Sequence, residues 1–235
     1  SRPFDTFDEV IEQANRLPYG LAAFAFTENG RRANMIGDLV DQLGGVEATG
    51  AALRDFRRRA AEAGVGELHL AAVTSDVFRA RPELHRSFGA LGIDSVNDYN
   101  WNHFLWGDQP LGQDPQLSYA AWRQAATKQW TADQDIFDAP VAPNVSVGWD
   151  STPRTPVGEP VRCEAWPYLP VVVDNTPGEL ETALRDGLTF LRQDGAAPYL
   201  TINAWNEWTE GAYLEPDNVW GTSKIDAVRN VLGSR

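Results

Sequence analysis

The 235-residue chain has a single cysteine, Cys163, and therefore cannot form an internal disulfide bond. Nothing in its cysteine usage points to an oxidising compartment. No apolar run reaches the roughly 18 residues of a transmembrane helix, and the N-terminus lacks the basic and apolar segments of a signal peptide. We expect a cytoplasmic, soluble protein that does not insert into a membrane.

Basic residues are also scarce. The chain carries 20 Lys and Arg against 33 Asp and Glu, which gives a formal net charge of −13. Nucleic acids and anionic membrane surfaces are bound through clustered basic residues, so neither is an expected partner. The charge alone does not identify a substrate.

Tryptophan is absent from the first hundred residues, whereas all nine tryptophans lie at or after Trp101. Aromatic rings offer large flat apolar faces, which suit the flat C–H faces of sugar rings. Trp122 and Trp130 fall on an expected helix and are better explained as packing residues. The remaining tryptophans are compatible with a site that binds carbohydrate.

Strand and helix patterns alternate along the chain after residue 50. The expected strands are Glu67–Val73, Asp94–Tyr99, Asn144–Gly148 and Tyr199–Ala204. The expected helices are Ala51–Ala63, Pro82–Leu91, Leu117–Ala132, Pro177–Gln193 (with Thr176 as N-cap) and Thr222–Leu232. This alternation predicts an α/β fold with a parallel sheet. A (β/α)8 barrel and a doubly wound sheet both fit, and the lack of a Gly-rich phosphate loop favours the barrel.

The last expected strand runs into LTINAWNEWTEGAYLEP, residues 200–216, which concentrates acids and aromatic rings. Glu207 and Glu210 are three residues apart, so a helical turn would place both on one face, about 5–6 Å apart at Cβ. Retaining glycosidases hold their two carboxyl groups about 5–5.5 Å apart. The alternative is a solvated acidic turn beside ordinary core aromatics.

Two earlier strand ends carry similar residues. Asp98, Tyr99 and Trp101 follow one strand, and Trp149, Asp150 and Arg154 follow the next. Acids and aromatics at the carboxyl ends of several strands are typical of the active face of a barrel. For Asp98 and Arg154 an ion pair that orders a loop is an equal alternative. The three histidines show no metal-ligand spacing, so no metal is expected.

The sequence NAWNEW-x-EG-x-YLEP resembles the C-terminal catalytic motif of family 99-like glycoside hydrolases, which include the WbsX-type proteins of bacterial surface-polysaccharide loci. The resemblance covers about residues 53–231 and corresponds to the second half of a (β/α)8 barrel. It implies cleavage of α-mannose-type or related linkages in an oligosaccharide or polysaccharide, with retention and without metal or cofactor. Catalysis in this family is thought to pass through a 1,2-anhydro sugar.

The same resemblance implies roles for single residues. Glu207 would be the base that takes the proton of the sugar 2-hydroxyl, and Glu210 would be the general acid and then the base. Tyr213, Glu215 and the GWD-x-x-x-R segment with Asp150 and Arg154 would bind hydroxyl groups. The other expected substrate contacts are Asp98, Tyr99, Trp101, Trp149, Trp205, Asn206 and Trp208.

The first forty residues are different. PFDTFDEVIEQANRLPYGLAAFAFT resembles a C-terminal segment of NAD-dependent aldehyde dehydrogenases of the succinate-semialdehyde type. The cofactor-binding and nucleophile motifs of that family are absent, and Cys163 lies in an unrelated context. We therefore predict a dehydrogenase-like segment at 1–40, with a helix, a strand at Leu21–Phe26 and a second helix. A partial barrel domain at 41–235 would follow the Gly-rich stretch DQLGGVEATG.

A complete barrel needs about 250 residues and eight units, whereas only about four units are found here. The chain would then be a fusion or a fragment, and open barrel edges would favour self-association. Three functions stay open at this point: a glycosidase, a non-catalytic carbohydrate-binding remnant, and a fragment of an NAD-dependent aldehyde dehydrogenase.

Overall fold

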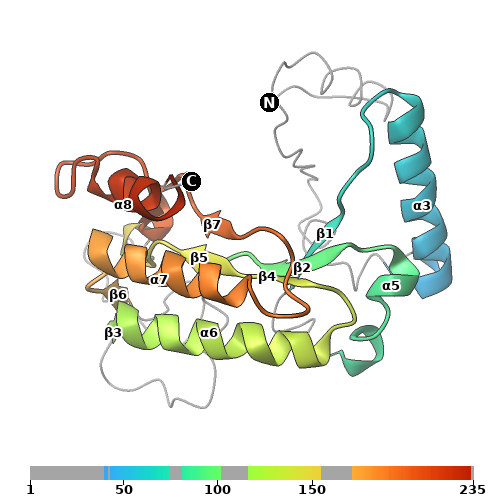
Figure 1. Cartoon of the computed structure of the whole chain (residues 1–235), viewed down its shortest axis with the longest axis horizontal. Helices are drawn as coiled ribbons and strands as arrows, with labels where there is room; N and C mark the ends of the chain where they lie inside the picture. Colours follow the sequence, from blue (N-terminus) through green and yellow to red (C-terminus); the bar gives the residue numbers. More distant parts are fainter. Residues whose placement is uncertain (1–39, 42, 75–80, 102–115, 155–170, 234–235) are drawn as a thin grey trace.

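The computed structural model of the chain describes residues 40–41, 43–74, 81–101, 116–154 and 171–233 (Figure 1). The elements expected before residue 40 and the loop that carries Cys163 lie outside these ranges. Within them the chain has a mixed α/β fold in which parallel strands are covered by helices.

The main strands are parallel and follow one another in space in their order along the chain. Strand β1 (Ala71–Thr74) pairs with β2 (Ser95–Asp98), which pairs with β4 (Val141–Ala142). After Pro143 the chain continues as β5 (Asn144–Ser146), which pairs with β7 (Thr201–Asn203). Pro143 has no N–H to donate, but its carbonyl accepts from Thr201 N at 3.0 Å, so the proline interrupts one continuous line of pairing. The four expected strands are thus confirmed, with shorter bounds.

A second parallel pair was not expected from the sequence. Strand β3 (Gln116–Ser118) pairs with β6 (Val171–Val173) in full register. The described strands do not close into a barrel. The described residues therefore form a mixed α/β fold whose main strands are parallel.

Five α-helices accompany these strands in the described ranges. They are α3 (Val46–Glu62), α5 (Phe88–Leu91), α6 (Tyr119–Ile136), α7 (Pro177–Phe190) and α8 (Ser223–Leu232). Helices α6 and α7 lie side by side, and α8 packs against α7 (Figure 1). The Thr176 side chain accepts from Glu179 N at 3.2 Å, which confirms the predicted N-cap of α7. None of the helices in the described part of the chain is long and apolar enough to cross a bilayer.

The helix predicted over Pro82–Leu91 is wrong as a single element. The structure has a 3-10 turn, η1 (Pro82–Leu84), and then the single turn of α5. Ser87 separates them because its hydroxyl donates to Leu84 O at 2.6 Å, while Phe88 N donates to Asp138 Oδ1 at 2.9 Å. These tertiary and local hydrogen bonds replace the helical ones across the break.

The core is built around a cluster of aromatic side chains. Trp101 is fully buried, and its indole N–H donates to Asn144 O at 2.6 Å. Trp122 meets Trp101 edge to face at 5.1 Å, and Trp130 lies 6.3 Å away. The packing roles of Trp122 and Trp130 are confirmed. Trp101, predicted as a substrate contact, lies fully buried in this cluster.

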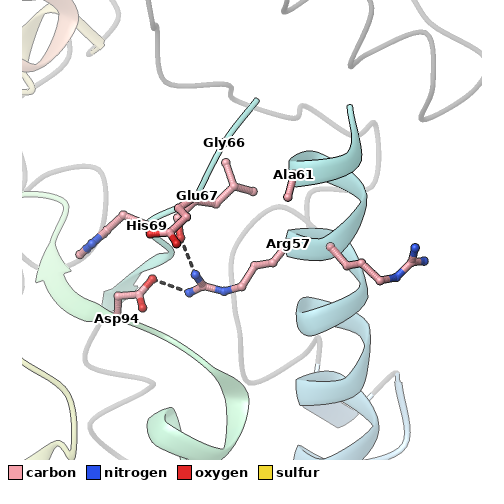
Figure 2. Close-up of a pocket in the computed structure, with 8 residues that line it drawn as sticks. Arg57, Ala61, Gly66, Glu67, His69 and Asp94 are labelled. Atoms are coloured by element: carbon pink, nitrogen blue, oxygen red, sulfur yellow. Dashed lines mark hydrogen bonds and ion pairs between the residues drawn. The ribbon is translucent and has the colours of Figure 1, made fainter. Parts of the chain in front are cut away.

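Helix α3 is attached to the sheet by Arg57 (Figure 2). Its guanidinium donates to Leu68 O, to Gly92 O at 2.8 Å, and to the Asp94 carboxylate. A groove of about 690 Å³ opens beside it, lined also by His69 and Glu67. Because Arg57 already satisfies three acceptors on two chain segments, its role here is structural.

We expect Gly50→Ala in α3 to destabilise the protein by about 1–3 kcal/mol through overpacking. A Cβ at Gly50 would lie 2.4 Å from Ala90 O of α5, which is backbone and cannot move aside cheaply. Gly178→Ala in α7 is the matched control, since its nearest neighbour would be 3.9 Å away and alanine favours helix. Urea unfolding of both variants measures the difference, and equal midpoints would contradict the close approach of α3 and α5.

Candidate functional site

The candidate site is built on a short hairpin that follows β7. Strand β8 (Asn206–Glu207) pairs antiparallel with β9 (Ala212–Tyr213), and the 3-10 turn η4 (Trp208–Glu210) joins them. Gly211 ends the turn with φ +63°, and a Cβ there would lie 2.8 Å from the Cβ of Asp150. Asp150 N donates to Glu210 O at 2.6 Å. A glycine is thus required both for the turn and for docking the hairpin on the segment after β5.

Glu207 and Glu210 share one cationic partner. Arg154 Nη2 lies 2.9 Å from Glu210 Oε1 and 3.8 Å from Glu207 Oε1. The two oxygens are therefore no farther apart than the sum of these distances. That limit is compatible with the separation of about 5–5.5 Å in retaining glycosidases, and it only reaches the lower end of the inverting range. The two side chains lie on one side of the turn, as their spacing predicts.

The two carboxyl groups have unequal surroundings. The side chain of Glu210 is only 7% exposed, against 37% for Glu207. Burial raises the pKa of Glu210, the charge of Glu207 adds to this, and Arg154 opposes it. Glu210 Oε2 is buried without a hydrogen-bond partner among the described residues. Compared with an exposed glutamate, this position shifts the equilibrium towards the protonated form, whose O–H can donate.

Glu207 is held by its neighbours in the turn. The Thr209 hydroxyl donates to Glu207 Oε1 at 2.8 Å and accepts from Arg154 Nη2 at 3.2 Å. Hydrogen bonds to a carboxylate fix its orientation. Glu207 thus presents a partly exposed carboxyl group in a defined position next to the buried acid.

Tyr99 brings the end of β2 to the same place. Its side chain is half exposed, and its pKa is raised by burial and by the nearby charges of Glu210 and Glu207. The Asn203 side chain, at the end of β7, is close enough to act on the same hydroxyl. Residues from beyond the ends of β2, β5 and β7 therefore meet around the acid pair.

The same hairpin also carries an aromatic pair. The rings of Trp208 and Tyr213 stack with centroids 3.9 Å apart and planes inclined by 19°. Trp208 Nε1 donates to Glu215 Oε2 at 2.7 Å, and the buried Lys224 places its Nζ 4.2 Å from the centre of the Tyr213 ring. A cation against the ring face and a stacked indole hold Tyr213 in place.

A pocket of about 330 Å³ lies beside this aromatic pair. Its lining includes Trp149, Asp150, Val172, Asn175, Trp208 and Tyr213. Trp149, Asp150, Trp208 and Tyr213 are among the predicted site residues. Val172 and Asn175 were missed, although the apolar VVV run followed by Asp174 and Asn175 is one more strand that ends in polar residues.

Three more predicted site residues are Asp98, Trp205 and Asn206. Asp98 is buried, and its Oδ1 accepts from Thr74 Oγ1 at 3.1 Å, so it joins the ends of β1 and β2. Trp205 and Asn206 are exposed on the hairpin, and the Trp205 carbonyl accepts from the backbone of Leu214 and Glu215. Their contact with substrate stays a prediction.

Comparison with known proteins identifies the family. A family model described as Glycosyltransferase WbsX matches residues 44–228, so this chain belongs to the WbsX family. The resemblance seen in the hairpin sequence is thereby confirmed. No solved structure matches the chain.

Two kinds of protein are similar in sequence to this chain. The uncharacterized protein WxcX of Xanthomonas campestris pv. campestris is 29% identical over 176 residues, which are 72% of this chain and 23% of WxcX. The chain thus spans about a quarter of the length of that relative. The 2-hydroxymuconic semialdehyde dehydrogenase of Pseudomonas putida is 48% identical over 56 residues, or 24% of this chain and 11% of the enzyme. The chain is therefore similar to two unrelated classes of protein, over parts of very different size.

Proposed function

We propose that this chain carries the acid pair of a retaining glycosidase that acts on α-mannoside-type or related linkages in bacterial surface polysaccharide. The observation that supports this most is the joint contact of Glu207 and Glu210 with Arg154, with one carboxyl buried and the other half exposed. Two carboxyl groups close together in unequal surroundings are what glycoside cleavage needs. Membership of the WbsX family supports a carbohydrate substrate. A cytoplasmic location is part of the same proposal.

The proposed reaction uses both carboxyl groups twice. Glu207 takes the proton of the sugar 2-hydroxyl, whose oxygen attacks the anomeric carbon while Glu210 protonates the leaving oxygen. The C–O bond to the leaving group breaks, and a 1,2-anhydro sugar forms. Glu210, now a carboxylate, then takes a proton from water, which opens the three-membered ring as Glu207 returns its proton to O2. Two displacements at one carbon retain its configuration.

The order of the strands supports half of a (β/α)8 barrel as the scaffold. In a barrel, consecutive strands are neighbours throughout, whereas a doubly wound sheet reverses its order at a switch point. Among the described strands, β1, β2, β4 with β5, and β7 follow one another without reversal, whereas β3 and β6 pair with each other outside this order. We further propose that 41–235 forms this partial barrel, separate from the dehydrogenase-like 1–40. Its outer strand β1, with Val73 57% exposed, would then be a site of self-association.

Glycosyl transfer is the second candidate, because the matching family is described as a glycosyltransferase. The same acid pair could form the anhydro sugar and let a hydroxyl of an acceptor sugar open it instead of water. Carbohydrate binding without turnover is a third candidate, given that the chain spans only a quarter of WxcX. A dehydrogenase fragment would have to bind NAD, which a calorimetric titration tests.

One experiment separates these candidates. The protein is incubated with an aryl α-mannoside and with bacterial surface polysaccharide, with and without an acceptor glycoside, and the products are followed by NMR. Free sugar released first as the α-anomer supports a retaining hydrolase, and a new glycoside supports transfer. Inverted product contradicts the proposed mechanism, and binding without any product leaves only the binding function.

We expect Arg154→Met to lower kcat/KM about 100-fold, since Arg154 holds both carboxyl groups. Removing the positive charge also raises the pKa of Glu210 further. The acid then keeps its proton to higher pH, so the alkaline limb of the pH–rate profile moves upward. Arg185→Met, an exposed arginine on α7, is the control. An alkaline limb that stays in place would contradict the coupling of Arg154 to the acid.

A further inference from the structure

The pocket beside Trp208 is adjacent to the acid pair but separate from it. The described residues that line it include Trp208 and Gly211, which flank the acids in sequence, but neither Glu207 nor Glu210. A molecule in this pocket would thus contact the chain neighbours of the two acids rather than their carboxyl groups. Its volume of about 330 Å³ is at the lower end of ligand pockets, which span about 300–1,000 Å³. One sugar ring fits this size better than a chain.

Two glycines allow the walls of the pocket to come together. A Cβ on Gly148 would lie 2.4 Å from the Asn175 side chain and 2.9 Å from Gly211 O. Gly211 in turn packs on Asp150. The segment after β5, the segment after β6 and the hairpin therefore converge only because these positions lack side chains.

The chemistry of the lining favours an uncharged polyhydroxy ring. Trp208 is 43% exposed and is fixed by its stacking on Tyr213, so it offers a rigid apolar face. The Asp150 carboxylate uses Oδ1 to accept from Thr152 N at 2.9 Å, which leaves Oδ2 as an acceptor. Asn175 donates to Val147 O at 3.2 Å, which leaves its amide oxygen as an acceptor. Acceptors and an aromatic ring in one pocket lining match the hydroxyl groups and C–H faces of sugars, and the negative charge of Asp150 disfavours phosphorylated or acidic sugars.

We propose that this pocket is a subsite for one neutral pyranose ring of the glycan, next to the ring whose bond is cleaved. Trp208 packs against a face of that ring, and Asp150 and Asn175 accept hydrogen bonds from its hydroxyl groups. The placement relative to the cleaved bond rests on the proposed glycosidase function. The binding of a sugar ring does not, because it can be measured without turnover.

The test is binding of methyl α-mannopyranoside and methyl α-glucopyranoside, followed by NMR titration of the full chain. We expect Trp208→Ala to weaken the affinity for the better ligand about tenfold or more, and Asn175→Ala to weaken it severalfold. Trp220→Ala removes another partly exposed indole that does not line the pocket, and it should leave the affinity within about twofold. Thermal melting of each variant confirms that it is folded.

The outcomes separate the subsite from the catalytic proposal. Loss of binding in Trp208→Ala but not in Trp220→Ala supports the subsite, even if the protein turns over no substrate. No saturable binding of either glycoside, or equal binding by wild type, Trp208→Ala and Asn175→Ala, overturns it even if the protein is active. Tighter binding of mannose 6-phosphate than of the neutral glycosides would also overturn it, since Asp150 should repel the phosphate.

Discussion

Replacing Glu207 with glutamine is expected to lower kcat/KM roughly 1,000-fold, on natural glycans and on substrates with activated leaving groups alike. The base must remove the proton of the sugar 2-hydroxyl before or as the anomeric bond breaks, and this requirement does not depend on the leaving group. Glutamine keeps the size of Glu207 and can still accept from Thr209, but it cannot take a proton. Initial rates with an aryl α-mannoside and with polysaccharide give the two values.

Glu62→Gln is the matched control for this substitution. Glu62 is an exposed acid on α3 that pairs, within the described ranges, with Arg58 of the same helix, so the same chemical change there should leave both rates within about twofold. A 2-deoxy substrate provides a second check, because it lacks the hydroxyl that Glu207 deprotonates. An active Glu207→Gln enzyme, or turnover of the 2-deoxy substrate at the normal rate, would remove Glu207 from the role of base.

The repeating strand and helix pattern was predictable because it depends on local signals. Thr176 followed by Pro177 specifies a helix start through a side-chain cap and a fixed φ, whatever packs around it. The four main strands likewise lie where short apolar segments with β-forming residues predicted them. The helix over Pro82–Leu91 failed because Asp138, fifty residues from Phe88, supplies the hydrogen bond that begins α5. Such a partner is not visible in a local pattern.

In the candidate site, too, the features set by local sequence were predictable and those set by tertiary packing were not. The spacing of Glu207 and Glu210 predicted a shared face, since a single turn fixes it. Trp101 and Trp149 both follow strands and both are buried in the core, yet Trp149 also borders the pocket. The direction of a side chain just beyond a strand depends on the helices that cover it, and Trp101 is covered by Tyr119 and Trp122 of α6. Asn175 could be found only after β6 was seen to end at the same pocket.

Glu210→Gln is expected to separate two classes of substrate. Natural glycans have alkoxide leaving groups that need a proton, so their kcat/KM should fall about 1,000-fold. Aryl glycosides with acidic phenols leave without that proton, and their rate of anhydro-sugar formation should fall about tenfold or less. Because burial disfavours the charged form of Glu210, the neutral amide is accommodated without loss of fold.

The pH dependence gives the same variant a second readout. The pKa of Glu210 is raised in the folded protein, and only the protonated acid can donate to the leaving oxygen. Wild-type activity on natural glycans should therefore fall as the pH rises through that pKa. In Glu210→Gln the alkaline fall should be absent with aryl glycosides, because the variant has no proton to lose at this position. Equal losses on both substrate classes, or an alkaline limb that persists in the variant, would assign the acid role to another group. In that case the buried carboxyl of Glu210 would pair with Arg154 without protonating the leaving group.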